Sequence, residues 1–396
     1  MKTLKFMGTV ELILSLTILF PEVIHAGDFA VDLYKQAARS KRNVVISPLG
    51  TKYAFSIAFL GARDQTAMEL SKVFGFSQDT SGADSSLSSS IRSIQAISEK
   101  GEVDLIAAAA LWPSKSIKMD STFVSRSRTT LGIDINQLDY NRPEVACRNV
   151  NSWASAATKG KFNSVISPSD FSPLTNIIVT SAVYFKGKWK YPFPKSSTTF
   201  LPFKLGKNEQ IEVNTMHQKS YFGYGENDSI QVLDLSYVDE NLSMVIVLPR
   251  AIDGLFDIEK SNMIDSIIGW SNGLRTAKVE VFIPRFKFSS RTDLKQNLIS
   301  MGIKTAFDFR KADFSGISRR QDSLFVEKVL QKAMIEVNEE GTEASAIDAI
   351  LMGVGGLGAP PPCPVFRADH PFLFIIKEKR TGTILFIGKV MNPLKG

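Results

Sequence analysis

The sequence predicts an α+β fold, and three observations lead to this class. The chain has 396 residues, of which 44% are hydrophobic and 22% charged, the balance of an ordinary globular protein with ample material for a core. Segments with apolar residues at helical spacing gather early in the chain, whereas strand-like runs dominate later. No Pro-, Gly- or Ser-rich linker interrupts residues 28–340, so one domain over residues 27–396 with mainly antiparallel sheets is expected.

Helices are expected where apolar residues recur at helical spacing. Pro143 suits the first turn of one of them, because a proline at that position removes no helical hydrogen bond. A helix pair is expected near Phe256 to Met301. The other expected helices cover residues 28–42, 48–61, 65–74, 85–98 and 141–159.

Strands are expected where short apolar or alternating runs occur. The run from Ile177 to Phe185 is apolar almost throughout and has strand length, which indicates a strand that is buried on both faces. The other expected strands cover residues 103–112, 230–236, 243–248, 278–283, 324–337, 372–376 and 383–390.

The N-terminus has the pattern of a signal peptide. Lys2 and Lys5 give a basic start, an apolar stretch runs from Met7 to Phe20, and Ala26 offers a small residue before a cut. We therefore expect residues 1–26 to be removed and the protein to be secreted. No later segment approaches 18 consecutive apolar residues, so no membrane partner is expected.

Two sequons and two cysteines bear on the prediction of secretion. Asn227 and Asn241 each begin an Asn-x-Ser pattern, which makes them candidate glycosylation sites in a secreted protein. Cys147 and Cys363 are too few for a disulfide scaffold, and nothing local in the sequence brings them together.

The chain is basic, with a formal net charge of +7. Its Lys and Arg residues are scattered, apart from small clusters at Lys41-Arg42 and at Lys186 to Lys190. The second cluster contains Trp189 and superficially suggests nucleic-acid binding, but a strand end with a solvated basic rim explains it better. No nucleic-acid partner is expected, whereas binding of a heparin-like glycosaminoglycan stays open.

Catalytic patterns are scarce, so the chain is not expected to be an enzyme. Gly269 to Gly273 matches Gly-x-Ser-x-Gly, which works only at a sharp strand-to-helix turn. Here a helical segment precedes the match and a strand follows it, so the match is accidental; a hydrolase built on Ser271 is the remote alternative. No phosphate-binding, dinucleotide, zinc or calcium motif occurs, and neither a cofactor nor a metal is expected.

One stretch breaks the α+β pattern. Residues 339–363 read EEGTEASAIDAILMGVGGLGAPPPC, with no Lys or Arg, an apolar glycine-rich middle and three consecutive prolines. An exposed loop of this length inside a compact domain is usually functional. Because its middle is apolar, it is not an ordinary solvated linker.

An ordered set of motifs resembles the serpin family over nearly the whole chain. The matching segments are Asn43 to Pro48 (NVVISP), Thr158 to Lys161 (TKGK), Tyr184 to Trp189 (YFKGKW) with Pro192-Phe193, Ile283 to Phe286 (IPRF), Phe366 to Phe374 (FRADHPFLF) and Gly388 to Pro393 (GKVMNP). Each motif alone could occur by chance, whereas the ordered set with consistent spacing is specific.

The resemblance implies a fold of three β-sheets and about nine helices with an exposed reactive-centre loop, here about residues 340–364. It implies a monomer that inhibits proteases as a single-use trap. A protease cleaves the loop and becomes acylated, and the freed loop then inserts as a new central strand of the largest sheet. A non-inhibitory serpin that acts as a carrier, chaperone or storage protein is the alternative.

The resemblance also assigns roles to individual residues. The hinge of the loop matches Glu339, Glu340, Gly341, Thr342, Glu343, Ala344, Ser345 and Ala346, whose small side chains suit passage between strands. Asp348 departs from the family, which prefers small residues there. Glu339 is expected to pair with Arg285, close to Trp189 of the strand-end motif. The positions of the family's polar gate beneath the sheet hold Ser47, Gly50, Ser181 and Gln331, so that network is expected to be rewired.

The scissile bond is expected in the apolar part of the loop. Family spacing from Glu339 gives Gly355-Gly356, but Leu357-Gly358 is chemically better because leucine fills an apolar pocket. Val354-Gly355 and Met352-Gly353 are weaker candidates. No Lys or Arg lies between Gly341 and Val365. We therefore expect chymotrypsin- or elastase-like serine proteases, or a cysteine protease, as partners.

Overall fold

The computed structural model describes residues 26–77, 103–133, 135–172, 175–261, 263–318, 324–340 and 363–396. Within these ranges the helices are α1 (Ala26–Ala37), α2 (Pro48–Gly61), α3 (Asp64–Phe74), α5 (Ser121–Leu131), α6 (Pro143–Ala157), α7 (Leu255–Lys260), α8 (Met263–Ser271) and α9 (Lys295–Ser300), with short 3-10 turns η1 (Pro168–Asp170), η2 (Lys195–Ser197) and η3 (Thr305–Phe307). The helix expected over 85–98 lies outside the described residues.

Local sequence signals account for the helix ends. Ser47 caps α2, because its side chain accepts a hydrogen bond from the Gly50 N–H, and Pro48 occupies the first turn. The helix α3 ends at Gly75, which has a φ of 66°, a left-handed conformation that glycine adopts without strain. All of α2 except Lys52 is buried, so this helix is a central element of the core.

A four-stranded sheet has the order β2-β3-β10-β9. Its strands are β2 (Val103–Pro113), β3 (Ile177–Gly187), β10 (Val326–Val337) and β9 (Phe286–Asp293). β2 and β9 pair with their neighbours in antiparallel fashion, whereas β3 and β10 are parallel to each other. Residues 177–185 are buried without interruption, as the apolar run predicts for a strand that is covered on both faces.

The remaining strands form a nine-stranded sheet with the order β1-β13-β12-β7-β6-β5-β8-β11, and β4 pairs with β5 off this path. They are β1 (Val44–Ile46), β4 (Thr199–Gly206), β5 (Glu209–Glu226), β6 (Ile230–Ser236), β7 (Leu242–Pro249), β8 (Arg275–Pro284), β11 (Val365–Arg367), β12 (Phe372–Glu378) and β13 (Ile384–Val390). The strand β5 pairs with β4 through its first half and with β6 near its end. Two of the three expected sheets therefore run into one another through β5.

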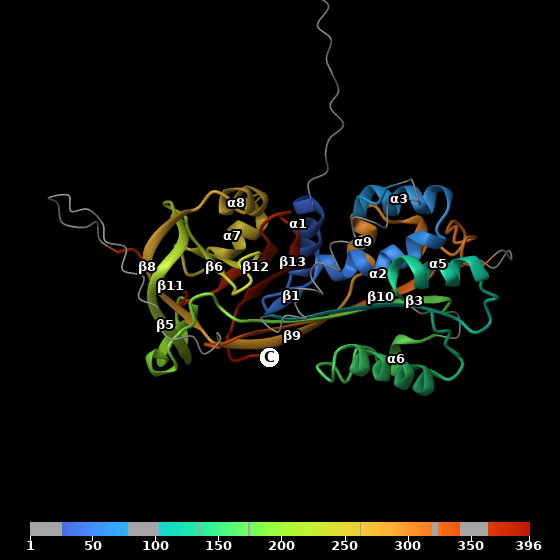
Figure 1. The fold of residues 1–396 in the computed structure, drawn as a ribbon, viewed down its shortest axis with the longest axis horizontal. Helices are drawn as coiled ribbons and strands as arrows, with labels where there is room; N and C mark the ends of the chain where they lie inside the picture. Colours follow the sequence, from blue (N-terminus) through green and yellow to red (C-terminus); the bar gives the residue numbers. More distant parts are fainter. Residues whose placement is uncertain are drawn as a thin grey trace, which may run out of the picture.

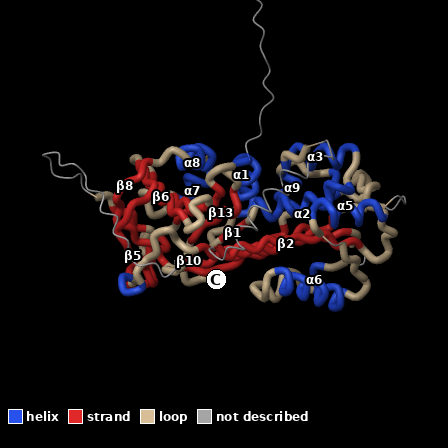
Figure 2. The backbone as a smooth tube through the Cα atoms, in the orientation of Figure 1, coloured by secondary structure: helices blue, strands red, loops and turns tan. Residues whose placement is uncertain are grey.

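The layers are seen in Figures 1 and 2. The helix α6 lies on one side of the four-stranded sheet, and α2, α3, α5 and α9 lie on the other. The strands β5, β6, β8 and β11 form one end of the molecule, below α7 and α8. A single large apolar cluster joins the helical side to both sheets, and two smaller clusters lie beneath α6.

Candidate functional site

The boundary between β3 and β10, here named the seam, is the place where the predicted loop meets the sheet. The two strands pair in parallel from Val326 and Ile177 to Ile335 and Phe185. After β10 the chain continues through Asn338, Glu339 and Glu340, and the next residue that the structure describes is Cys363. A segment that folds back from this point between β3 and β10 would be antiparallel to both strands. Antiparallel pairing is slightly more stable per residue than the parallel pairing it would replace.

Glu339, which follows the C-terminal end of β10, anchors the start of the predicted hinge. Its side chain is 2% exposed, pairs with Arg285 through a hydrogen bond of 2.5 Å from Nε, and accepts a second bond from the Thr198 hydroxyl. Burial raises the pKa of Glu339, but the bonds from Arg285 and Thr198 outweigh burial and leave the pKa below its usual value. Glu339 is therefore ionised at neutral pH and holds the start of the loop against the sheet.

Trp189 supports the same point. Its Nε1 donates a hydrogen bond of 2.9 Å to the Asn338 carbonyl oxygen, and its ring stacks on Tyr237 at 4.6 Å. The ring is 3% exposed, so it is not available for stacking on nucleobases.

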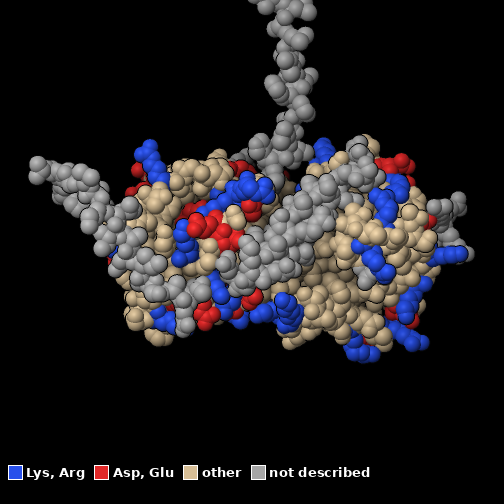
Figure 3. Space-filling view, viewed as in Figure 1, with Lys and Arg blue, Asp and Glu red and all other residues tan. Residues whose placement is uncertain are grey.

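The basic cluster at Lys186 to Lys190 is largely paired. Lys186 forms ion pairs with Glu340 at 2.9 Å and Glu336 at 3.3 Å, and Lys190 pairs with Glu240 at 2.9 Å. Basic and acidic side chains are interspersed on the face drawn in Figure 3. These pairs leave fewer free cations for an anionic polysaccharide.

The gate residues lie beneath the middle of the seam, on the side of α2. The Gln331 Oε1 accepts a hydrogen bond of 2.7 Å from the Ser47 N–H, and its Nε2 donates to the Ser47 carbonyl at 2.8 Å and to Thr51 Oγ1 at 2.9 Å. The Ser47 hydroxyl donates to the Leu385 carbonyl. Gln331 thus ties β10 to the first turn of α2, in a network that is fully buried.

Ser181 and Gly50 lie beside this network but do not join it. The Ser181 hydroxyl is buried and has no hydrogen-bond partner among the described residues. The missing side chain of Gly50 makes room for Ser181 and Val183, because a Cβ at position 50 would lie 2.7 Å from Ser181 Oγ and 2.5 Å from Val183 Cγ2. This network therefore couples β10 to α2, and Ser181 of β3 takes no part in it.

Two contacts of this site were not anticipated from the sequence. Thr51 bonds Gln331, and Thr198 bonds Glu339 from a position 141 residues earlier. A threonine in a loop carries no local signal of such a contact, so the sequence offered no means of finding Thr198.

The Gly-x-Ser-x-Gly match has the expected helix-turn-strand surroundings. Ser271 ends α8, donates a hydrogen bond to the Ile268 carbonyl, and accepts one of 2.7 Å from Lys377 Nζ. The serine is 5% exposed and lies before β8, not at a strand-to-helix turn. It lacks the geometry of a nucleophile elbow.

Several predicted residues lie outside the described part of the chain. They are Gly341, Thr342, Glu343, Ala344, Ser345, Ala346, Asp348, Met352, Gly353, Val354, Gly355, Gly356, Leu357 and Gly358. Of the others, Asn227 and Asn241 are exposed in turns, and Cys147 and Cys363 are free thiols. Among the described residues no group of His, Cys, Asp or Glu is arranged to hold a metal ion, and no helix is long and apolar enough to cross a membrane.

Comparison with known proteins identifies the family. The family model described as serpin (serine protease inhibitor) matches residues 25–393, and the chain belongs to this family. The chain is 35% identical to human leukocyte elastase inhibitor over 92% of its own length and 97% of that protein. It is 34% identical to serpin B6 of Macaca fascicularis, covering 93% and 98% of the two chains. The solved structure of a tumour suppressing serpin superposes with a TM-score of 0.81 at 28% identity, covering 93% of this chain and 98% of that one.

The comparisons contradict the prediction that the protein is secreted. The two relatives are matched over 97% and 98% of their own length by 92% and 93% of this chain, so they contain little sequence that could correspond to its apolar N-terminal segment. The prediction rested on that segment and on two short sequons, and patterns of this kind also arise by chance. Secretion is therefore not part of the proposal below.

The expectation that the chain is not an enzyme is restated by the comparisons in terms of inhibition. The name leukocyte elastase inhibitor describes inhibition of a protease. That name concerns the relative and describes inhibition, whereas the sequence argument addressed catalysis alone.

Proposed function

We propose that the protein inhibits serine proteases of chymotrypsin- or elastase-like specificity, or a cysteine protease of similar preference, by strand insertion at the seam. The observation that carries the proposal is the parallel pairing of β3 with β10, which leads directly into the loop. The polar ties of β10 at Gln331 and Glu339 support it, because they hold the strand beside which a folded-back loop would pair.

The chemistry begins in the protease. Its serine or cysteine attacks the carbonyl carbon of the residue before the scissile bond, and an ester or thioester forms while the next residue leaves as the free amine. The loop is then cut from β11 and remains attached to β10. It folds back into the seam and carries the acylated enzyme with it.

Insertion supplies the driving force. The new strand bonds to β3 on one side and β10 on the other. At about 1 kcal/mol for each net hydrogen bond, a dozen inserted residues release on the order of 10 kcal/mol.

The residues of the loop support the target class. The candidate bonds Leu357-Gly358, Gly355-Gly356 and Val354-Gly355 present apolar or small residues, and no basic residue is available for a trypsin-like pocket. The similarity to leukocyte elastase inhibitor agrees with an elastase-like target.

The test is incubation of the full chain with elastase, chymotrypsin, trypsin and a cysteine protease such as papain. We expect a covalent complex that survives boiling in detergent with elastase or chymotrypsin and little with trypsin. Mass spectrometry of the released C-terminal fragment should show a start at residue 358, 356 or 355. A fragment that starts at residue 368 would contradict the proposed specificity.

A matched pair of hinge variants separates trapping from cleavage. Thr342→Arg forces a long cation toward the core face of the inserted strand, so the loop should be cut without trapping. Glu343→Arg changes the neighbouring residue, whose side chain would point to the opposite face of an inserted strand, and this variant should trap normally. An unchanged yield of complex with Thr342→Arg would mean that the loop does not insert.

A non-inhibitory serpin is the second candidate, and Asp348 is the feature that favours it. A carboxylate among the inserted residues opposes burial in the sheet. Cleavage of the wild-type loop by every protease without a stable complex would select this candidate.

A further inference from the structure

A pocket of about 680 Å³ lies between the C-terminal end of α1, the turn that joins β4 to β5, the segment that carries α7, and the end of β13 (Figure 1). The residues that line it belong to neither β3 nor β10, so the pocket is separate from the seam. Small organic ligands bind in pockets of about 300 to 1,000 Å³. The volume therefore suits a ligand of that size, and the chemistry of the lining residues defines which kind of ligand fits.

The floor of this pocket is polar, buried and internally paired. Lys389 of β13 is 3% exposed, and its Nζ donates a hydrogen bond of 2.6 Å to the Ala38 carbonyl and pairs with Glu259 of α7 at 2.9 Å. The Tyr34 hydroxyl of α1 donates a hydrogen bond of 2.5 Å to the same carboxylate. Burial, and then Glu259, raises the pKa of Tyr34 well above its usual value, so the hydroxyl remains a donor. These side chains therefore satisfy one another and fix the shape of the floor.

The walls are apolar and come from separate parts of the chain. They include Leu205 at the end of β4, Ile252 before α7, Phe256 of α7 and Met391 after β13. The Phe256 side chain is 57% exposed. An exposed aromatic ring in a pocket is surface that a ligand can remove from water. The walls therefore favour a ligand with an apolar body.

Three cations at this pocket have no acidic partner among the described residues. Arg39 and Lys41 follow α1, Lys260 ends α7, and all three are exposed. Arg39 donates a hydrogen bond to the neutral Gln36 side chain. The Lys260 Nζ lies over the Phe256 ring, 5.1 Å from its centroid. These cations are therefore available to an anion that enters the pocket.

The other charges at the rim of the pocket are nearly all paired. Asp253 pairs with Lys207 at 3.2 Å, and Lys35 pairs with Asp265 at 3.8 Å. Within the described part of the chain, Asp257 is the only lining carboxylate that has no cationic partner. Three unpaired cations thus meet one unpaired carboxylate, and this excess of positive charge favours an anionic ligand.

We propose that this pocket binds a small amphipathic anion. The apolar body of the ligand lies against Leu205, Phe256 and Met391, and its carboxylate or sulfonate lies beside Arg39 and Lys41. Guanidinium and ammonium groups bind such an oxyanion through charge-assisted hydrogen bonds. The site goes beyond protease inhibition, because its residues lie neither in the seam nor in the loop.

Dodecanoate is the test ligand, and isothermal titration calorimetry measures its binding to the full chain below the concentration at which it forms micelles. We expect a single dodecanoate to bind to each chain. The affinity should fall as salt is added, because the cations of the rim are exposed. Dodecyltrimethylammonium, which has the same apolar chain and the opposite charge, should bind far more weakly. Equal affinities for the two compounds would overturn the proposal.

A pair of phenylalanine variants tests the apolar wall. Phe256→Ala should raise the Kd for dodecanoate about fivefold, because it removes apolar surface from the wall. Phe309→Ala is the matched control: Phe309 is 53% exposed and has the Arg310 guanidinium 5.1 Å from its ring centroid, but it does not line the pocket. Both rings are exposed, so neither variant should disturb the core. The same Kd for both variants would place the ligand elsewhere and overturn the site.

A pair of lysine variants tests the rim. Lys41→Glu should raise the Kd about tenfold, which corresponds to about 1.4 kcal/mol. Lys115→Glu is the matched control, because Lys115 is also exposed, forms no ion pair within the described residues and undergoes the same change of charge. An equal loss of affinity in both variants would mean that net charge governs binding and that the pocket does not.

Vesicles of phosphatidylglycerol separate a free amphiphile from a membrane lipid, since both carry an anionic head and an apolar chain. We expect dodecanoate to bind while the protein does not sediment with the vesicles. Sedimentation with the vesicles in the absence of dodecanoate binding would overturn the pocket in favour of a membrane surface.

Discussion

Gln331 and Ser181 lie directly opposite each other across the seam, and their side chains do not bond to one another. Gln331 turns to the Ser47 backbone and to Thr51, so its amide is satisfied. The Ser181 hydroxyl remains without a partner among the described residues, although it is buried. A buried hydroxyl without a hydrogen bond destabilises the native state, which is the state that the proposed insertion would replace.

Replacing Ser181 by alanine should therefore stabilise the native protein. We expect the free energy of unfolding to rise by about 1 kcal/mol, because the variant removes an unsatisfied group and little volume. Urea unfolding at constant m-value measures the change. Ser243→Ala is the control, since Ser243 is equally buried but donates a hydrogen bond to Asp234, and its loss should lower stability. A destabilised Ser181→Ala would mean that the hydroxyl has a partner.

Gly50→Ala should destabilise the protein by about 1–3 kcal/mol through overpacking. The new methyl would lie 2.5 Å from Val183 Cγ2, and the β-branched valine is confined within β3. Unfolding in urea measures the loss, and Val183→Ala in the same chain should recover part of it. Gly269→Ala in α8 is the control: no atom lies within 4 Å of the position that the new Cβ would take, so helix propensity should leave this variant neutral or slightly more stable.

Arg285→Met should release Glu339 and loosen the hinge. The folded pKa of Glu339 lies below its usual value, so the stabilising contribution is complete above about pH 4.3, the value in the unfolded chain, and is lost as the pH falls through the folded pKa. The wild type should thus exceed Arg285→Met in unfolding free energy at pH 6, and the difference should shrink toward pH 3. A difference that is constant over this range would show that Glu339 does not supply it.

Asp348→Thr should improve trapping. Thr342, Ala344, Ala346 and Asp348 share one face of an extended strand, and a buried carboxylate must either remain unpaired or take up a proton. Each added 1.4 kcal/mol slows insertion about tenfold while the acyl-enzyme hydrolyses. More than one molecule of the wild-type protein should therefore be consumed for each protease molecule trapped, and Asp348→Thr should lower this ratio.

Titration of residual protease activity at two pH values measures this ratio. Mildly acidic pH should help the wild type more than Asp348→Thr, because protonation removes the buried charge. Equal ratios near one for both proteins at both pH values would show that Asp348 finds a partner or stays in solvent.

The sequence by itself determined the features that depend on local pattern. The apolar run at residues 177–185 predicts a strand covered on both faces, and Ser47-Pro48 predicts the start of a helix; both are present. The order of motifs predicted the serpin family, which the comparisons confirm. Other elements carried no such pattern: β5, β9 and α5 contain mixed polar and apolar residues, and none of them was predicted.

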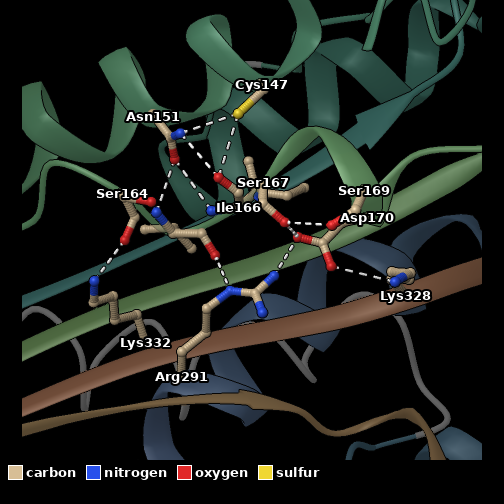
Figure 4. Close-up of polar contacts among 11 residues, drawn as sticks. Cys147, Asn151, Ser164, Ile166, Ser167, Ser169, Asp170, Arg291, Lys328 and Lys332 are labelled. Carbon is tan, nitrogen blue, oxygen red and sulfur yellow. Dashed lines mark hydrogen bonds and ion pairs between the residues drawn. The ribbon is translucent and has the colours of Figure 1, made fainter. Parts of the chain in front are cut away.

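Only the tertiary structure decided which residues meet at the seam. Gln331 bonds Ser47 across 284 positions of sequence, and Arg291 reaches Asp170 across 121 (Figure 4). Helix and strand patterns repeat over a few residues, so they specify an element and the face it buries but not the partner that packs against it. The parallel pairing of β3 with β10, the unpartnered Ser181 and the ion pair of Arg291 with Asp170 all arise from such long-range contacts.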